Sequence, residues 1–177
     1  MDMRSIKEFL KDTLKYLIVI FVVLFIFLYI FSFQQIVGSS MEPNLSNGNL
    51  IFLDKVIYKI KKPLRGDIIS FSYSDTNNLI KRVIGLPGEY VSIKNNKIYI
   101  DNKELVEYYL KDQINNDFEL SSLGYDKIPD NMYFVLGDNR TDSVDSRDSR
   151  VGVISSKDII GKVRFVIWPI NKFKVVK

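Results

Sequence analysis

The sequence contains no cysteine and no histidine among its 177 residues. Without cysteine, the chain has no disulfide framework and no thiolate metal site. Without histidine, it lacks the usual general base of hydrolytic enzymes and the commonest metal ligand of proteins. We therefore expect neither a metal ion nor a cofactor, and any proton transfer must rely on another type of side chain.

The chain also has little net charge. Its 25 basic and 21 acidic residues give a formal charge of +4, and residues 34–177 alone carry +3. A protein whose main partner is nucleic acid usually has a far stronger basic bias. We therefore expect no nucleic-acid partner.

Charge is absent altogether from residues 16–33, which read YLIVIFVVLFIFLYIFSF. Eighteen apolar residues are about the minimum for a helix that crosses a bilayer. Four basic residues precede the segment, and the next one follows only at Lys55. The positive-inside rule then predicts a single-pass protein of the cell membrane, with residues 1–15 in the cytoplasm and residues 34–177 outside. A cleaved secretory signal fits less well, because the apolar run is too long and no small-x-small cleavage site follows.

Residues 34–177 are rich in β-strand patterns. Runs of Ile, Val, Phe and Tyr are separated by Gly, Pro, Asn and Asp. The Asn95–Asn96 pair predicts a tight hairpin turn, whereas residues 104–130 are less regular and residues 104–112 would suit a short helix. The sequence thus predicts a mainly β fold, with an antiparallel, partly closed β domain behind one N-terminal transmembrane helix. The expected strands cover residues 49–58, 66–73, 79–86, 90–93, 97–102, 132–138 and 162–168.

The first stretch that offers chemistry is VGSSMEPNLSNG, residues 37–48. Gly38 permits close backbone approach or unusual dihedral angles, and Pro43 stiffens the loop. Ser39 and Ser40 lie at its turn, where a hydroxyl can be presented to a substrate. Taken alone, such a stretch is typical of a polar linker that leaves a membrane.

A second stretch, LIKRVIGLPGE at residues 79–89, places two cations inside an apolar strand. Strand alternation puts Lys81 and Arg82 on opposite faces and does not say which of them points inward. Arg stays charged in proteins, whereas a desolvated Lys can lose its proton and act as a base. The alternative is an edge-strand lysine that guards against aggregation.

A third stretch, GDNRTDSVDSRDSR at residues 137–150, is dense in Asp, Ser and Arg. It could be an ordinary solvated loop. A calcium loop would need a closing glutamate that is missing here, and a phosphate-binding loop would need a Gly-Lys-Ser/Thr motif. The functional interpretation is a scaffold of hydrogen bonds and ion pairs that holds a site together.

Together and in this order, these stretches resemble the bacterial type I signal peptidases of the Gram-positive type. The family pattern is a transmembrane anchor, a Ser-Met-x-Pro-Thr-Leu box, an Arg-Gly-Asp strand, a Lys-Arg-x-x-Gly-x-Pro-Gly-Asp box and a Gly-Asp-Asn-x-x-x-Ser-x-Asp-Ser-Arg box. Here the boxes read SMEPNL (40–45), RGDIISF (65–71), KRVIGLPGE (81–89) and GDNRTDSVDSR (137–147). Asn44 replaces the usual Thr and Glu89 the usual Asp, and the family pattern makes neither position the nucleophile or the base.

The resemblance implies a membrane-bound serine endopeptidase with a Ser–Lys dyad, in which Ser40 is the nucleophile and Lys81 the general base. Lysine would replace the missing histidine, provided that burial lowers its pKa from about 10.4. Ser143 would hydrogen-bond to Lys81 and orient it, and Arg82 would be an outward partner of the acidic loop rather than a catalyst. The supporting positions are Gly137, Asp138, Asp145 and Arg147.

The implied partners are the lipid bilayer and exported preproteins, which would be cleaved after a segment with small residues at positions −3 and −1. The family binds that segment as an added β-strand over shallow apolar pockets. The backbone N–H of Ser40 would be one oxyanion donor. The second donor stays open, because Gly38 stands where Gram-negative relatives carry a serine. By position, the substrate-binding residues are Ile36, Gly38, Met41, Leu45, Leu79 and Ile80.

Two alternatives remain at this point. One is a specialised Ser–Lys processing protease for a single exported substrate. The other is a membrane-tethered binding protein that has lost catalysis, which the presence of Ser40, Lys81 and Ser143 argues against. A self-cleaving repressor also uses Ser and Lys, but the apolar anchor disfavours it.

Overall fold

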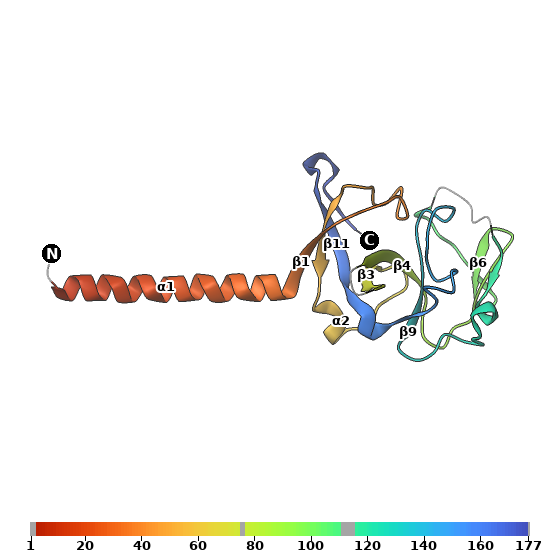
Figure 1. The fold of residues 1–177 in the computed structure, drawn as a ribbon, viewed down its shortest axis with the longest axis horizontal. Coiled ribbons are helices and arrows are strands. Elements are labelled where there is room, and N and C mark those ends of the chain that lie inside the picture. The colour runs from red at the N-terminus through yellow and green to blue at the C-terminus, as the bar shows by residue number, and fades with distance from the viewer. Residues whose placement is uncertain (1–2, 75–76, 111–115, 177) are drawn as a thin grey trace.

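The computed structural model describes residues 3–74, 77–110 and 116–176. A long helix, α1 (Met3–Ile30), projects from a β domain that contains the rest of the chain (Figure 1). None of the residues of α1 is buried, and an 18-residue window of it has a mean hydropathy of 2.6. By length and composition, α1 is therefore a candidate membrane span.

Helix α1 ends at Ile30, three residues before the end of the predicted apolar segment. Phe31 begins strand β1 (Phe31–Gln35), which pairs with β2 (Leu50–Asp54) in antiparallel register. The ring of Phe52 lies 4.7 Å from that of Phe31 and 5.7 Å from that of Phe165, measured between centroids. This aromatic cluster packs the end of α1 against the sheet.

The larger sheet has eight strands, and every adjacent pair is antiparallel. Its order is β1-β2-β11-β3-β4-β9-β10, with β12 paired to β11. Among the described residues, β1 and β10 do not pair with each other, so the curved sheet is only partly closed (Figure 1). The strands not yet given are β3 (Ile68–Ser72), β4 (Asn78–Gly85), β9 (Met132–Leu136), β10 (Ile154–Ser155), β11 (Ile159–Trp168) and β12 (Lys174–Val175).

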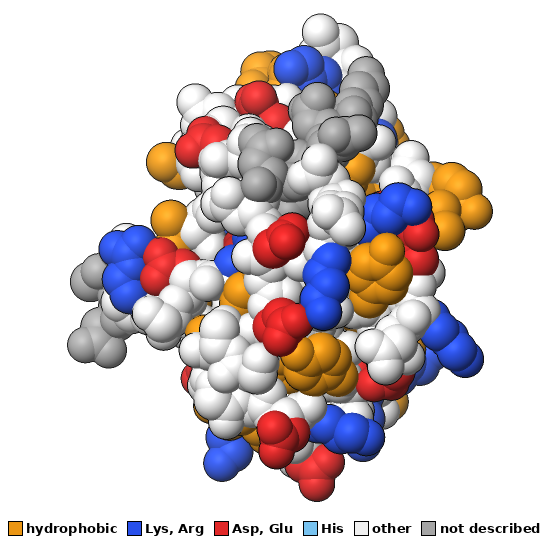
Figure 2. All heavy atoms as spheres, turned by 90° about the vertical axis from the view of Figure 1, so that its right-hand side faces the viewer, with side chains coloured by type: hydrophobic (Ala, Val, Ile, Leu, Met, Phe, Trp, Pro, Cys, Tyr) orange, Lys and Arg blue, Asp and Glu red, His pale blue; other side chains and the backbone are white. Residues whose placement is uncertain are grey.

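A smaller antiparallel sheet lies at the end of the domain remote from α1 (Figure 1). Its order is β7-β6-β5-β8, from β5 (Val91–Lys94), β6 (Lys97–Ile100), β7 (Lys103–Leu105) and β8 (Phe118–Glu119). Asn95 and Asn96 join β5 to β6 with φ angles of 51° and 64°, so the predicted hairpin turn is confirmed. Figure 2 shows this end of the molecule, where acidic, basic and apolar side chains are intermixed.

Short helical segments connect several strands. They are α2 (Ile57–Ile60) and the 3-10 turns η1 (Leu120–Leu123), η2 (Ser156–Asp158) and η3 (Ile170–Lys172). The strand predicted at 49–58 ends early, because Asp54 Oδ1 accepts hydrogen bonds from the backbone N–H groups of Val56 and Ile57. This local side-chain turn leads the chain into α2.

The helix expected at residues 104–112 is wrong for the part that the structure describes. Residues 103–105 form β7, irregular chain with a turn at Tyr108 and Tyr109 follows as far as Leu110, and residues 111–112 lie outside the described residues. Contacts with distant parts of the chain explain the absence of a helix in this described part. Glu107 pairs with Arg140, and the carbonyl of Tyr109 accepts a hydrogen bond from Asn44. These contacts replace the local hydrogen bonds of a helix.

Strand β4 is buried on both faces. Ile80 packs in a cluster with Met41 and Leu45, beneath the loop that follows β1, while Val83 packs in a second cluster with Phe71. Every residue from Ile80 to Gly85 is buried. The interpretation of its lysine as a solvated edge residue therefore fails, and both cations of the strand lie in the interior.

Candidate active site

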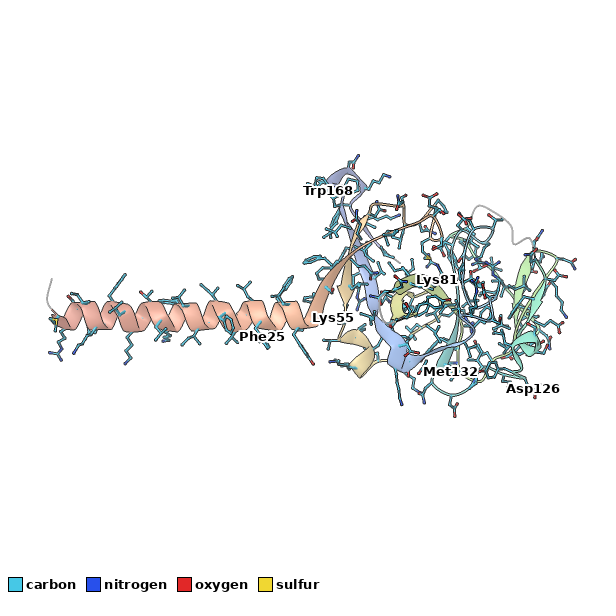
Figure 3. The ribbon with its side chains drawn as sticks, viewed as in Figure 1. Phe25, Lys55, Lys81, Asp126, Met132 and Trp168 are labelled. Carbon is cyan, nitrogen blue, oxygen red and sulfur yellow. The ribbon has the colours of Figure 1, made fainter. Side chains whose placement is uncertain are left out.

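The structure brings Ser40 and Lys81 into contact, although 41 positions separate them in the chain. Ser40 lies in the turn after β1, and Lys81 lies in β4. Lys81 Nζ donates a hydrogen bond to Ser40 Oγ over 2.7 Å. Lys81 is only 2% exposed, and Figure 3 shows it inside the β domain, away from α1.

Burial lowers the pKa of Lys81 to about 8, well below the ordinary value for lysine. Val83, two residues along on the same face of β4, belongs to a buried apolar cluster. The negative charges of Asp145 and Asp138 raise the pKa, and the positive charge of Arg147 lowers it again. A large fraction of the amine is therefore neutral in mildly alkaline solution.

Residues of the 137–147 loop hold the turn that carries Ser40. The backbone N–H of Asn139 donates to the carbonyl of Ser40 over 3.0 Å, and its side-chain amide donates to the carbonyl of Ser39 over 3.3 Å. The hydroxyl of Ser39 donates to a carboxylate oxygen of Asp142. Ser40 is thus fixed by its backbone and neighbours, which leaves its Oγ to contact Lys81.

Gly137 allows this close approach between the two loops. A Cβ atom at position 137 would lie 2.5 Å from the carbonyl oxygen of Ser40 and 2.2 Å from Ser143 Oγ. Both distances are shorter than heavy atoms tolerate, so any larger residue must displace one of the loops.

Arg82, on the opposite face of β4 from Lys81, forms a two-pronged ion pair with Asp138. Its Nε and Nη2 atoms donate to the two carboxylate oxygens over 2.8 and 2.7 Å. Asn44 Nδ2 donates to Asp138 Oδ2 over 2.9 Å, and the Arg82 guanidinium lies over the ring of Tyr109. Arg82 is therefore a partner of the acidic loop, but it is buried rather than outward, because the sheet is covered on both faces.

Asp145 also has its own cation. Arg147 donates to both Asp145 oxygens over 2.8 and 2.9 Å, and the backbone N–H of Gly137 donates to Asp145 Oδ2 over 3.0 Å. Arg140 donates to the carbonyl of Gly137 over 2.8 Å and pairs with Glu107. Each of the two carboxylates that most raise the pKa of Lys81 is thus paired with an arginine.

Ser143 lies beside these groups but does not make the expected hydrogen bond to Lys81. Its Oγ atom is buried and has no hydrogen-bond partner within the described part of the chain. Lys81 Nζ is engaged with Ser40 instead. An unpaired buried hydroxyl costs about 1–3 kcal/mol, so this position is notable in a site that is otherwise well paired.

A cavity of about 320 Å³ opens beside Ser40 and Lys81. Four of the six residues predicted to bind substrate line it, while Leu45 is fully buried in the core below and Gly38 is exposed outside the lining. The lining also includes polar residues that the sequence did not single out. The full set is Gln34, Gln35, Ile36, Val37, Ser40, Met41, Asn77, Asn78, Leu79, Ile80 and Lys81.

The backbone N–H of Gly38 is already engaged. It donates to Asn47 Oδ1 over 3.1 Å, within the same loop. It is therefore not free to serve as a second oxyanion donor in this conformation, and Gly38 has no side chain to supply one.

Comparison with known proteins identifies the family. The model of the family "Signal peptidase, peptidase S26" matches residues 7–168. The chain belongs to this signal peptidase family. It is a serine peptidase with an apolar N-terminal helix that is consistent with membrane anchoring.

Individual relatives agree with this assignment. The chain is 38% identical over 147 residues to signal peptidase I of Bacillus caldolyticus, covering 78% of this chain and 80% of that protein. It is 36% identical over 152 residues to signal peptidase IB of Staphylococcus aureus, covering 78% of each. The crystal structure of a signal peptidase I from Enterococcus faecalis superposes with a TM-score of 0.52 and 39% identity, over 58% of this chain and 97% of that one.

Sequence reasoning on this signal peptidase did not single out four residues that hold the site. Asn139, Arg140 and Asp142 belong to the 137–147 motif, so the motif itself was the available signal. Glu107 lies outside every motif, and its pairing with Arg140 depends on chain segments 33 positions apart. Nothing local in the sequence indicates that contact.

We expect Gly137→Ala to lower kcat/KM of the signal peptidase about a hundredfold. The added methyl group must push Ser40 or Ser143 away, and a shift of about 1 Å at a reacting atom has a cost of this size. Peptidase assays on the purified variant, with thermal unfolding in parallel, give the measurement. Gly124→Ala is the control for crowding near the site, because no atom lies within 4 Å of its added Cβ; its φ of 82° strains the backbone, so it should lose stability without losing kcat/KM. An unchanged kcat/KM in Gly137→Ala would contradict the close-approach argument.

Proposed function

We propose that this signal peptidase is a membrane-anchored serine endopeptidase that removes signal peptides from exported preproteins, with Ser40 as nucleophile and Lys81 as general base. The contact of 2.7 Å between Lys81 Nζ and Ser40 Oγ carries the proposal. The lysine is only 2% exposed, and burial lowers its pKa to about 8. A neutral amine at this distance can accept the serine proton.

The reaction would proceed through an acyl-enzyme ester. Ser40 Oγ attacks the scissile carbonyl while its proton passes to Lys81 Nζ. The resulting ammonium then protonates the leaving amine as the peptide bond breaks. In the second half, the neutral amine takes a proton from water, whose oxygen attacks the ester carbonyl. The ester bond then breaks, the acid leaves, and the ammonium returns its proton to Ser40 Oγ. The backbone N–H of Ser40 would be one donor to the oxyanion.

The surrounding residues would position the dyad. Asp138 and Asp145, each held by an arginine, fix the loop whose Gly137 lies against the carbonyl of Ser40. Arg147 also favours the neutral form of Lys81. Ser143 Oγ, buried and without a partner among the described residues, would accept a hydrogen bond from Lys81 once that lysine has been protonated.

The cavity beside Ser40 suits an extended peptide with small side chains. Of the larger sheet, β1 is an end strand, and residues 78–81 of β4 pair with β3 alone among the described strands. Residues from both segments line the cavity, so a substrate strand could add between them. Ile36, Met41, Leu79 and Ile80 would form shallow pockets for small residues at positions −3 and −1.

The proposed topology is a single membrane crossing by residues 16–33, mostly as α1. Residues 1–15 would face the cytoplasm, and residues 34–177 would form the catalytic domain outside. Basic residues on the N-terminal side of the apolar segment support this orientation. The cleft would then meet preproteins on the side of the membrane where their signal peptides emerge.

We expect Ser40→Ala and Lys81→Met each to lower preprotein cleavage by at least about a thousandfold, as loss of a catalytic dyad member should. Methionine keeps the volume of the buried lysine, so the fold should survive. Lys81→Ala should be equally inactive. Ser39→Ala is the matched control and should retain substantial activity, because the Ser39 hydroxyl contacts only Asp142 among the described residues. Full activity in a purified Lys81→Met variant would refute the dyad, whereas a wild-type chain that binds preproteins without cleaving them would favour a binding protein.

The cleavage rate should rise with pH through about 8. Lys81 acts as a base only when deprotonated, so the active fraction falls tenfold for each pH unit below its pKa. At pH 5 the predicted kcat/KM is roughly a thousandth of its alkaline plateau. A pH–rate profile on a soluble peptide substrate, with circular dichroism at each pH to verify folding, measures this dependence. A rate that stays flat down to pH 5 is incompatible with a lysine base.

The absence of cysteine makes the orientation easy to test. Lys11→Cys and Lys127→Cys each introduce the only thiol in the chain. In intact protoplasts, a membrane-impermeant maleimide should label the variant at 127 and not the variant at 11. After permeabilisation both should react. Labelling of position 11 alone in intact protoplasts would reverse the proposed topology.

A further inference from the structure

Two lysines outside the catalytic cleft lie where α1 enters the β domain. Lys55 directly follows β2, Lys59 lies in α2, and both reach back to the last turn of α1. Lys55 Nζ donates to the carbonyl of Leu28 over 3.0 Å, and Lys59 Nζ donates to the hydroxyl of Tyr29 over 2.9 Å. Figure 3 shows Lys55 at this junction, far from Lys81.

The two lysines border a cavity of about 340 Å³, separate from the one beside Ser40. An ammonium group has three N–H donors, and the contacts to α1 use one from each lysine. Further N–H groups, together with the hydroxyl of Ser156, are available to an oxyanion. The other lining residues are Tyr29, Tyr58, Ile159 and Ile160.

The positive charge at this cavity is not balanced by nearby acids. Among the described residues, neither Lys55 nor Lys59 forms an ion pair. Asp54 pairs with Arg164 and Asp67 pairs with Lys162. Asp158, which precedes the lining residue Ile159, forms no ion pair among the described residues, and the neighbouring Lys157 offsets its charge. The exposed Lys61 and Lys62 follow α2 and add to the excess of positive charge.

Apolar side chains are interspersed with these lysines. Ile60, in α2, is 77% exposed, and Leu64 is 64% exposed. Exposed aliphatic residues beside lysines are typical of a segment that rests in the membrane interface. In Figure 1, α2 lies on the side of the β domain from which α1 projects.

The length of α1 sets the depth of the cavity. Residues 16–30 carry no charge and span about 22 Å at 1.5 Å per residue, which is shorter than a hydrocarbon core of about 30 Å. Such a mismatch draws flanking lysines toward the headgroups. Lys55 and Lys59, beside the last turn of α1, therefore lie at the level of the lipid phosphates if α1 crosses the membrane.

We propose that this cavity binds the phosphate-bearing headgroup of an anionic phospholipid, held by Lys55 and Lys59. The site rests on the proposed membrane crossing and is independent of the Ser40–Lys81 chemistry. An anionic lipid is favoured over a zwitterionic one, because each juxtamembrane lysine gains roughly fivefold from the negative surface. A lipid bound there would fix the height and rotation of the β domain, and with it the cleft, relative to the bilayer.

Native mass spectrometry of the full chain, released from detergent micelles, tests the site. The protein is titrated with phosphatidylglycerol or phosphatidylcholine of identical acyl chains. The wild type should bind phosphatidylglycerol more tightly. The double variant Lys55→Gln/Lys59→Gln should lose roughly 30-fold in affinity for that lipid and little for phosphatidylcholine. Lys55→Arg/Lys59→Arg should keep most of the affinity.

The matched control is Lys103→Gln/Lys127→Gln, which removes the same charge from exposed positions at the remote end of the domain. It should bind both lipids like the wild type.

Lys59→Gln alone keeps the Lys55 contact to α1, so it tests the site with the helix junction intact and should lose roughly fivefold in affinity for phosphatidylglycerol. Equal affinity of the wild type for the two lipids, or undiminished binding in a folded double glutamine variant, would overturn the proposal. So would displacement of the lipid by an equal concentration of glycerol phosphate, which would indicate a soluble phosphate ligand. Because the readout is bound lipid, failure of the peptidase proposal would leave this result intact.

Discussion

The burial of one lysine is the constraint on which the rest of this structure depends. Lowering the pKa of Lys81 to about 8 means that the folded chain disfavours the charged form by on the order of 3 kcal/mol. The sign follows from desolvation: the unfolded lysine is protonated where the folded one is not, so this term destabilises the fold near neutral pH and vanishes as pH rises above the unfolded pKa. The apolar clusters on the two faces of β4 must offset that free energy.

The charges around Lys81 matter as much as its burial. Two carboxylates, Asp138 and Asp145, are close enough to raise its pKa, and left unpaired they would favour the ammonium form. Arg82 and Arg147 hold them in ion pairs. A buried ion pair is weak evidence for stability, but here the pairing limits the negative field at the amine. The arginines therefore act on the electrostatics around Lys81 as well as on the shape of the loop.

Much of this arrangement could be predicted from the sequence, and the predictions that were wrong have identifiable physical reasons. The hairpin at Asn95–Asn96 was predictable because two residues with positive φ are a local requirement. The end of α1 was not predictable, because the Phe-Ser-Phe sequence of residues 31–33 suits both a membrane helix and strand β1. Alternation along β4 separated Lys81 from Arg82 but did not show that both faces are covered, so the burial of Arg82 was missed. The contact between Glu107 and Arg140 is purely tertiary, and together with the Asn44–Tyr109 contact it replaces the expected helix over the described residues 104–110.

The motifs predicted that Ser40 and Lys81 act together and that Lys81 is desolvated, but they indicated nothing about Lys55. Lys81 and Lys55 are both lysines, but Lys81 is buried beside Ser40 whereas Lys55 contacts α1 near the surface. Lys81 lies in an apolar interior, where nearby acids are paired and the neutral amine is favoured. Lys55 lies at the surface, where its ammonium meets a helix carbonyl and can retain water or contact a phosphate. The proposed base must be kept from water, whereas the proposed phosphate contact must stay accessible. The first condition is met at Lys81 because β4 is covered on both faces. The second is met at Lys55 because β2 ends beside the last turn of α1.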